Sequence, residues 1–133
     1  MIAGVADTHT ALWYLFGDAR LSVRAKEFID QAAAARRSIE ISPISLAEVI
    51  YLIEKNRLPA SAFDDLRNAL DNPNHLFKEA PLTGDVVKTM RQVPRDEVPD
   101  MPDRIVAATA VHFGVPVISR DGRIRASSVQ TIW

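Results

Sequence analysis

The sequence contains no cysteine and no apolar stretch long enough to cross a membrane, and both absences narrow the range of functions. Without cysteine the chain has no disulfide framework, no thiolate metal ligand and no cysteine nucleophile. A membrane-spanning helix needs about 20 consecutive apolar residues, and no run approaches that length. The first residues carry no basic stretch ahead of an apolar segment. We therefore expect no secretory signal peptide, no membrane contact and a cytoplasmic location.

The chain has no marked excess of positive or negative charge: it contains 16 Lys and Arg and 17 Asp and Glu, which gives a net charge of −1. Nucleic-acid-binding proteins are usually basic, so the total charge does not indicate an RNA or DNA partner. The distribution is less even. Residues 101–133 hold four arginines (Arg104, Arg120, Arg123 and Arg125) against two aspartates. These arginines suit contacts with phosphates, but arginines at this density more often belong to a solvated surface.

The pattern of apolar residues predicts one α/β domain that spans residues 1–133, a length that suits a single hydrophobic core. Segments with a strand pattern alternate with segments of helical period, which favours a mostly parallel sheet covered by helices on both faces. The predicted strands are 2–6, 38–42, 75–79, 115–119 and 129–133. The predicted helices are 8–16, 23–35, 46–57, 60–70, 84–92 and 103–113, with 122–127 as a turn or short helix and the proline-rich 93–102 as an ordered loop.

Four acids stand at or near the ends of the predicted strands. Asp7 follows the first strand, Glu48 lies in the first turn of the helix after the second strand, and Asp121 lies just beyond the fourth. In parallel sheets, ligands bind beyond the carboxyl ends of the strands. Asp103 opens the helix before the fourth strand, and only the folded structure places it relative to the others.

Each acid also has a purely structural interpretation. Asp7 and Asp121 suit the N-cap of a helix, and Ser45-x-x-Glu48 has the form of a capping box. Asp103 suits a helix N-terminus, where its charge complements the helix dipole. Taken one at a time, these interpretations are favoured over a functional role. The combination of four acids in one predicted region favours function.

Glu48 strengthens the functional interpretation because it stands among apolar residues, Ile44, Leu46, Val49 and Ile50. This pattern predicts a partly enclosed carboxylate. An enclosed carboxylate close to others is costly unless a positive charge lies between them. A set of oxygen ligands suits Mg²⁺ or Mn²⁺, which bind carboxylates together with water and substrate phosphate. Such a site activates water for attack on a phosphodiester.

The sequence resembles PIN domains of the VapC toxin type in four segments that occur in the same order, and the resemblance extends to the closing Val129-x-x-Ile132-Trp133. The four segments are Asp7-Thr8-His9 followed by Leu12-Trp13, Ser42-x-x-Ser45-Leu46-x-Glu48, Asp103-Arg104-Ile105-Val106-Ala107-Ala108-Thr109-Ala110, and Val117-Ile118-Ser119-Arg120-Asp121.

This resemblance implies a three-layer α/β/α fold and an endoribonuclease that depends on Mg²⁺ or Mn²⁺. It also implies a small antitoxin protein that covers the active site, and a homodimer. By the match, the acidic quartet comprises Asp7, Glu48, Asp103 and Asp121, with Thr8 and Ser119 as neighbouring polar residues.

Some residues depart from the family pattern, and others near the acids have no role that the resemblance assigns. Gly4 interrupts the first strand, and Ala47 stands where many relatives have a bulky aromatic residue. Asp100 precedes Asp103 by three residues and is either a fifth acid of the site or the N-cap of the helix; the cap is favoured. His9 suits an orienting or packing role better than acid–base chemistry. Trp13 is predicted to belong to the core rather than to stack on a base.

Two other classes of function stay open on the sequence. The first is another phosphoryl-transfer α/β enzyme. A haloacid-dehalogenase-like enzyme needs a second aspartate two residues after Asp7, where this chain has His9, and a receiver domain needs an acidic pair at the end of the first strand. The second is a catalytically silent PIN-fold module that binds RNA or protein. The intact set of four acids counts against it.

Overall fold

A five-stranded sheet with the order β3-β2-β1-β4-β5 forms the centre of the computed structural model, which describes all residues 1–133. Every pair of neighbouring strands is parallel. The strands are β1 (Ile2–Ala6), β2 (Ser38–Ile41), β3 (Phe77–Glu79), β4 (Val117–Ile118) and β5 (Thr131–Ile132). The predicted α/β class and parallel sheet are therefore confirmed. The chain builds β2 and β3 on one side of β1, and then β4 and β5 on the other.

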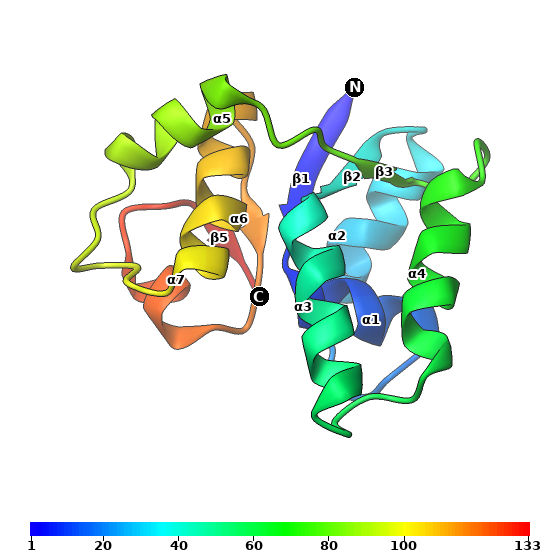
Figure 1. Cartoon of the computed structure of the whole chain (residues 1–133). Coiled ribbons are helices and arrows are strands. Elements are labelled where there is room, and N and C mark those ends of the chain that lie inside the picture. The colour runs from blue at the N-terminus through cyan, green and yellow to red at the C-terminus, as the bar shows by residue number, and fades with distance from the viewer.

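Seven α-helices and one 3₁₀ helix connect the strands (Figure 1). They are α1 (Thr8–Phe16), α2 (Val23–Ala34), α3 (Pro43–Glu54), α4 (Ser61–Asp71), α5 (Gly84–Thr89), η1 (Met90–Gln92), α6 (Met101–Phe113) and α7 (Gly122–Ala126). No helix is long and apolar enough to span a membrane.

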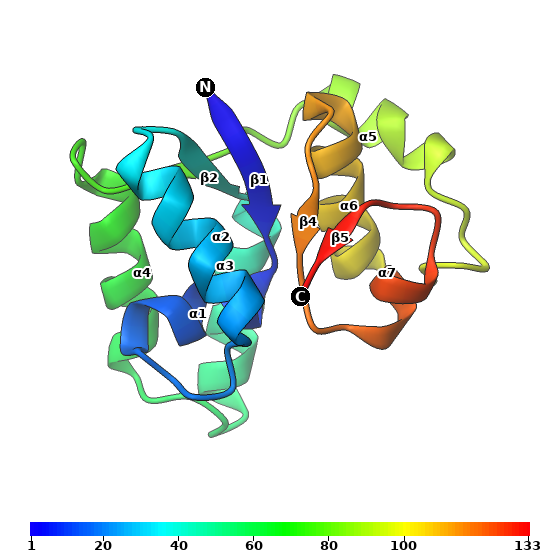
Figure 2. The same ribbon diagram turned by 180° about the vertical axis from the view of Figure 1, so that it is seen from behind.

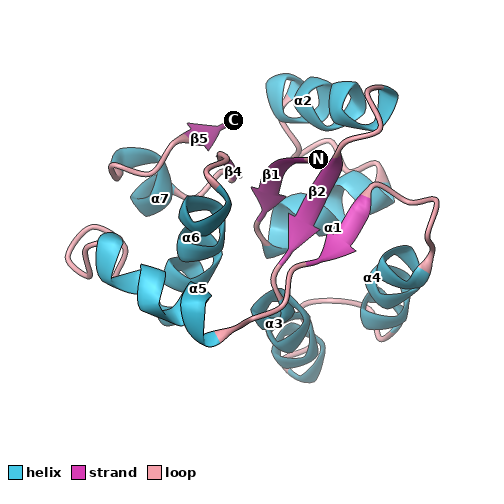
Figure 3. Cartoon of the chain, turned by 90° about the horizontal axis from the view of Figure 1, so that it is seen from above, coloured by secondary structure: helices cyan, strands magenta, loops and turns pink.

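The helices cover both faces of the sheet. Seen from behind, α2 lies in front of β1 and β2 (Figure 2), and α5 and α6 lie on the opposite side of the β1–β4 pair (Figure 3). The alternation of side chains along β1 and β4 explains this arrangement, because successive residues of a strand face opposite sides. Val5 and Val117 are partners in the sheet and belong to the core shared with α5, α6 and α7. Their neighbours, Ala6 and Ile118, belong to the core shared with α1 to α4.

Gly4 marks a point of close approach between β1 and β4. A Cβ atom at this position would lie 3.1 Å from the Pro116 carbonyl oxygen and 3.3 Å from side-chain atoms of Ile118 and Phe28. The register between β1 and β2 also shifts between Ile2 and Gly4. The glycine therefore lets β4 and α2 pack against the strand that carries Asp7.

Two helices begin earlier than the sequence predicts, and both begin at a cap. Ser42 is the N-cap of α3, where its hydroxyl accepts a hydrogen bond from the Ile44 N–H, and Pro43 takes the first helical position. The capping-box interpretation of Ser45 and Glu48 is therefore wrong, because Ser45 lies inside the helix and Glu48 lies beyond its first turn. The helix α6 begins at Met101 because Asp100 caps it, which confirms the cap predicted for Asp100.

The strands β4 and β5 are shorter than predicted, with two residues each. The apolar sequence begins before β4, at Val115 and Pro116, but only Val117 and Ile118 pair with β1 in the ladder. The hydrogen bonds Val5 N–H to Pro116 O (3.0 Å) and Asp7 N–H to Ile118 O (3.2 Å) close the edge between β1 and β4. The hydrogen bond to Ile118 holds the backbone of Asp7, the first acid of the predicted quartet, beside β4.

Candidate active site

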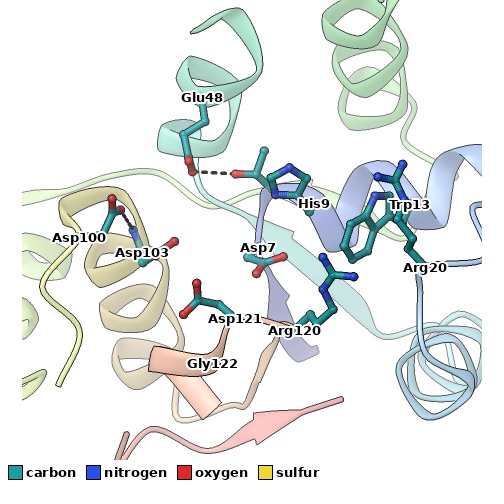
Figure 4. A pocket seen from close by; sticks show the side chains of 11 residues that line it. Asp7, His9, Trp13, Arg20, Glu48, Asp100, Asp103, Arg120, Asp121 and Gly122 are labelled. Atoms are coloured by element: carbon teal, nitrogen blue, oxygen red, sulfur yellow. Dashed lines mark hydrogen bonds between the residues drawn. The ribbon is translucent and has the colours of Figure 1, made fainter. Parts of the chain in front are cut away.

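A pocket of about 520 Å³ opens at the carboxyl ends of β1 and β4, where the strand order reverses direction. Ligands of open α/β sheets bind at such switch points. Five carboxylates line this pocket, and the four predicted acids are among them (Figure 4). They are Asp7, Glu48, Asp100, Asp103 and Asp121.

Asp7 is held between two elements by its two carboxylate oxygens. Its Oδ1 accepts a hydrogen bond from the Thr10 N–H at 2.9 Å and so caps α1. Its Oδ2 accepts a hydrogen bond from the Ser119 hydroxyl, which comes from the end of β4. Both the structural interpretation and the convergence on one site are therefore correct for this residue. The cap sets the orientation of the carboxylate at the pocket.

Asp121, which follows β4, also caps a helix and lines the pocket. Its Oδ1 accepts from the backbone N–H groups of Arg123 and Ile124, at 2.9 and 3.1 Å, and caps α7. Its own N–H donates to the Ser119 hydroxyl oxygen at 3.0 Å. Ser119, which is fully buried, therefore connects Asp7 to Asp121. The predicted role of Ser119 as a neighbouring polar residue agrees with this geometry.

Glu48 is half-buried and reaches the pocket from α3. Its Oε1 accepts a hydrogen bond from the Thr8 hydroxyl at 2.8 Å. Thr8 itself is 3% exposed and is the first residue of α1, directly after Asp7. Burial raises the pKa of Glu48, the Thr8 hydrogen bond lowers it, and the charges of Asp100 and Asp7 raise it again.

Asp100 and Asp103 enter the pocket together from the N-terminus of α6. The Asp100 Oδ1 accepts a hydrogen bond from the Asp103 N–H at 3.1 Å, and its side chain lies at the exposed rim. The Asp103 carboxylate makes no hydrogen bond to protein and is half-buried. The helix α6 packs on β1 and β4, and this packing brings Asp103 to the edge that carries Asp7 and Asp121.

The pKa of Asp103 is shifted because the carboxylate is half-buried close to four other acids. Burial, together with the charges of Asp121, Asp100, Glu48 and Asp7, raises its pKa from 3.8 to about 7. The protein places no cation among these carboxylates, because the two basic side chains of the pocket lie on its other side (Figure 4). A half-buried carboxylate that has no hydrogen bond and stands among other carboxylates is stabilised in its charged form by an added positive charge.

The donor set fits a hard divalent cation. All five acidic side chains offer oxygen atoms, and the pocket contains no thiolate. No three Asp, Glu or His side chains are already close enough together to form a complete metal site. Mg²⁺ does not need such a cage, since it keeps several waters and typically takes one or two carboxylates together with substrate phosphate. The wide, polar pocket therefore suits Mg²⁺ or Mn²⁺ better than a dehydrated ion.

Trp13, Arg20 and Arg120 form the wall opposite the acids, and this group was only partly predicted. Trp13 is 5% exposed, which confirms its predicted place in the core, yet its ring also lines the pocket. The guanidinium carbon of Arg120 lies 4.7 Å from the centre of the Trp13 ring, and that of Arg20 lies 5.1 Å from it. His9 is exposed beside them, 5.5 Å from the same ring. This placement agrees with a packing role.

Arg20 is the residue of the site that the sequence reasoning missed. It lies beyond the end of α1, where no strand edge or helix start points to it. The only signal in the sequence is Asp18-x-Arg20, a spacing at which the acid binds the guanidinium. Arg104 is one of the four C-terminal arginines that the sequence offers for phosphate contacts or for a solvated surface, and the structure gives it neither role. Its guanidinium instead donates to the carbonyl oxygens of Val93 and Met90, at 2.8 and 2.9 Å.

Comparison with known proteins places this geometry in context. Residues 5–128 match the family model described as PIN domain. Over 126 residues the chain is 25% identical to a protein named Ribonuclease VapC22 from Mycobacterium tuberculosis (strain ATCC 25618 / H37Rv), with 95% of this chain and 92% of that protein covered.

Solved structures share the fold over nearly the whole chain. VapBC2 from Rickettsia felis, bound to a DNA fragment from its promoter, gives a TM-score of 0.70 at 14% identity and covers 98% of this chain and 97% of its own. A toxin–antitoxin complex from Klebsiella pneumoniae gives 0.64 at 22% identity, with the same coverage. FitAcB from Neisseria gonorrhoeae gives 0.61 at 19% identity and covers 96% and 95%.

Proposed function

The chain belongs to the PIN domain family, and we propose that it is a metal-dependent endoribonuclease that acts as the toxin of a toxin–antitoxin pair. The family model spans all four acids of the predicted quartet. The name of the relative from Mycobacterium tuberculosis supports the ribonuclease activity. The structures that share the fold include a toxin–antitoxin complex, which supports the toxin role. A cytoplasmic location is part of the proposal, because its substrate is RNA.

One observation carries the catalytic part of this proposal: five carboxylates surround one open pocket without a cation of the protein between them. Helix caps alone do not account for it. The carboxylate of Asp103 makes no hydrogen bond and gains nothing from its half-buried position, which raises its pKa to about 7 together with the nearby acids. A purely structural acid is normally paired or solvated. The arrangement is understandable if the charge of a bound cation offsets the cost.

In this proposal Asp7, Glu48, Asp103 and Asp121 hold the cation, with Asp100 at the rim. When bound, Mg²⁺ or Mn²⁺ supplies an activated water and neutralises charge on the phosphodiester. The hydrogen bonds of the protein leave an oxygen of Glu48 and of Asp121 free. The Oε1 atom of Glu48 is fixed by Thr8, and the Oδ1 atom of Asp121 is fixed by the start of α7. The remaining oxygens, Oε2 and Oδ2, have no partner in the protein.

Ser119 and Thr8 position the acids. The Ser119 hydroxyl donates to Asp7 and accepts from the Asp121 N–H, so it keeps two acids from different strands in register. Thr8 orients Glu48 and holds its charged form by a hydrogen bond that lowers its pKa. Neither hydroxyl needs to react. Both restrict the carboxylates to one geometry, which is what catalysis by positioning requires.

The partner in this proposal is an antitoxin protein that places an Arg or Lys near Asp7 and Asp103, because a guanidinium fork matches a pair of carboxylates. An apolar helix of the antitoxin would cover exposed apolar side chains on the neighbouring helices α1 and α3. Phe16 is 44% exposed, Ile50 is 42% exposed and Tyr51 is 66% exposed. A homodimer remains a prediction from the family resemblance, and analytical ultracentrifugation of the purified chain tests it.

Cleavage of RNA by the purified chain tests the activity. We expect Mg²⁺-dependent cleavage that Asp7→Asn reduces by at least about 10²-fold, the scale of losing one electrostatic catalytic group. Asparagine retains an oxygen for the Thr10 N–H, so the cap and the fold are expected to survive. Asp65→Asn is the matched control, because Asp65 is exposed on α4 and makes no side-chain hydrogen bond or ion pair.

Three results would contradict the proposal. Full activity of Asp7→Asn, or undiminished activity of the wild type in excess EDTA, would remove the metal-dependent mechanism. Binding of RNA without any cleavage would instead support the catalytically silent module. For the toxin role, expression of the chain alone is expected to slow bacterial growth, and co-expression with the product of a neighbouring small gene is expected to restore it.

A further inference from the structure

We propose that Arg20 and Arg120, held against Trp13, form a binding subsite for a backbone phosphate of the RNA beside the acidic half of the pocket. The inference rests on the proposed function, since it names how the same site holds its substrate. The two arginines line the pocket together with the five acids, and they are its only strongly basic side chains.

Trp13 acts in this subsite as a support for cations. Its indole is 5% exposed, and both guanidinium groups lie within about 5 Å of the ring centre. A buried ring that already carries two guanidinium groups has no free face to stack on a base. The attraction between a guanidinium and the face of an indole restricts the long arginine side chains, so less conformational entropy is lost when they bind an anion.

Most hydrogen-bond donors of these arginines are free. Arg120 makes no hydrogen bond and no ion pair through its side chain, and the residue is exposed, so all five of its N–H donors face solvent or the pocket. Arg20 donates to Asp18 from Nε (3.0 Å) and Nη2 (2.7 Å), and its Nη1 group has no partner. The Asp18 hydrogen bonds hold the guanidinium in place and raise its pKa.

The local backbone places Arg120 at the boundary between the two halves of the pocket. It lies between Ser119, which donates to Asp7, and Asp121, which caps α7. Figure 4 shows Asp7 between the acids and the arginines, with Glu48, Asp103 and Asp121 on one side and Arg20 and Arg120 on the other. A phosphodiester strand that crosses Asp7 therefore meets a cation-binding half and a guanidinium half in succession.

The chemistry of the two halves favours RNA over an acidic protein segment. A guanidinium fork matches the oxygens of a phosphate. A carboxylate from a protein would bring a further negative charge beside five acids and would gain only the arginines. A phosphate of RNA gains the arginines, and a divalent cation held by the acids would attract the next phosphate along the strand.

The deciding experiment measures binding of a fluorescein-labelled single-stranded RNA 12-mer by fluorescence anisotropy, in Mg²⁺ and at several salt concentrations. The full chain carries Asp7→Asn so that the RNA stays intact, which a gel verifies. We expect Arg120→Ala to weaken binding about 10-fold, as for the removal of one charge-assisted hydrogen bond. The slope of log affinity against log salt should become shallower by about 0.7 for each phosphate of the single strand that the protein no longer neutralises. Arg20→Ala together with Arg120→Ala should weaken binding further.

Controls separate this subsite from general charge and from damage to the fold. Arg125→Ala removes an exposed arginine from α7, outside the pocket, and is expected to change the affinity less than about 2-fold. Arg120→Lys keeps the charge and should restore part of the affinity and the salt slope. Circular dichroism melting of each variant shows whether removal of the guanidinium from the Trp13 ring unfolds the chain.

Failure of this inference is distinguishable from failure of the proposed function. RNA binding that is unchanged in the double variant overturns the subsite, and so does a wild type with no affinity for RNA. The subsite is also overturned if the arginine substitutions weaken binding of a protein partner but leave RNA binding unchanged. If RNA binds through the arginines but the wild type does not cut it, the subsite stands and the nuclease falls. In an active wild type, Arg120→Ala should raise KM more than it lowers kcat.

Discussion

Replacing Asp103 with asparagine is expected to stabilise the metal-free protein and to remove its nuclease activity. The carboxylate of Asp103 is half-buried, makes no hydrogen bond, and has a pKa raised from 3.8 to about 7 by burial and by the charges of the other four acids. Asparagine has nearly the same shape and no charge. Its backbone N–H still donates to Asp100, so the start of α6 is unaffected.

The magnitude follows from the shift in pKa. A rise of about 3 units corresponds to about 4 kcal/mol at 1.36 kcal/mol per unit for a fully buried group. Asp103 keeps contact with solvent, and screening reduces this to about 1–2 kcal/mol. For a chain of 133 residues, 1 kcal/mol raises the melting temperature by about 4 °C, so we expect a gain of roughly 4–8 °C.

The dependence on pH has a definite sign. The folded state holds the Asp103 proton up to about pH 7, whereas the unfolded state releases it near 3.8. The folded state therefore binds more protons between these values. The contribution of this group to stability is fully present below about pH 4 and is lost as the pH rises through 7. Asp103→Asn should flatten this part of the stability profile.

Thermal unfolding in EDTA between pH 4 and 8 measures both effects. Asp65→Asn serves as the control, because it removes one exposed negative charge away from the pocket. Addition of Mg²⁺ should stabilise the wild type and leave Asp103→Asn nearly unchanged. A melting temperature that falls, or that stays equal to the wild-type value in EDTA at pH 7–8, would refute the reasoning from charge crowding.

Three further predictions test the positioning of the acids and the sheet. Asp100→Asn should change stability and turnover little, since asparagine caps as well as aspartate, whereas Asp100→Ala should cost about 1 kcal/mol of unfolding free energy in urea titration. If Asp100→Asn is as inactive as Asp103→Asn, Asp100 belongs among the metal ligands. Thr8→Val removes the hydrogen bond to Glu48 and should lower kcat about 10-fold or more in a folded protein, with Thr8→Ser close to wild type in the same RNA-cleavage assay. Gly4→Ala pushes a Cβ atom against the Pro116 carbonyl and should destabilise the chain by about 1–3 kcal/mol in thermal unfolding, and an unchanged melting temperature would mean that β4 moves aside freely.

The elements that the sequence predicts best are those with a cap at both ends. Asp7 and Gly17 delimit α1 at the residues expected, because one side chain accepts from the first turn and the glycine adopts a φ of 62°. The start of α3 was placed three residues too late, since the apolar period begins at Leu46 whereas the cap lies at Ser42. Hydrophobic periodicity reports the buried face of a helix. It does not report the polar residue at which the helix begins.

The candidate site was predictable where the acids follow strands. Asp7 and Asp121 belong to the sheet edge by their position in the sequence alone. Asp103 reaches the same edge only because α6 packs on β1, a contact between segments that are about 100 residues apart. Arg20 lies in a turn with no periodic pattern, and its place against Trp13 depends on tertiary packing. Acids that directly follow a strand were therefore predictable from their own position in the sequence, whereas placing the residues brought in by long-range packing required the folded structure or the family resemblance.

The strand order has a consequence for the protein during its own synthesis. Asp7 emerges from the ribosome long before Asp121, yet Ser119 and β4 must lie beside β1 before the two acids face one pocket. A nascent chain that ends before β4 carries Asp7, Glu48 and Asp103 without the strand that orients them. Translation products and proteolytic fragments that end before β4 are thus expected to lack the assembled pocket. The complete site can form only after the segment from β4 to Asp121 has been made.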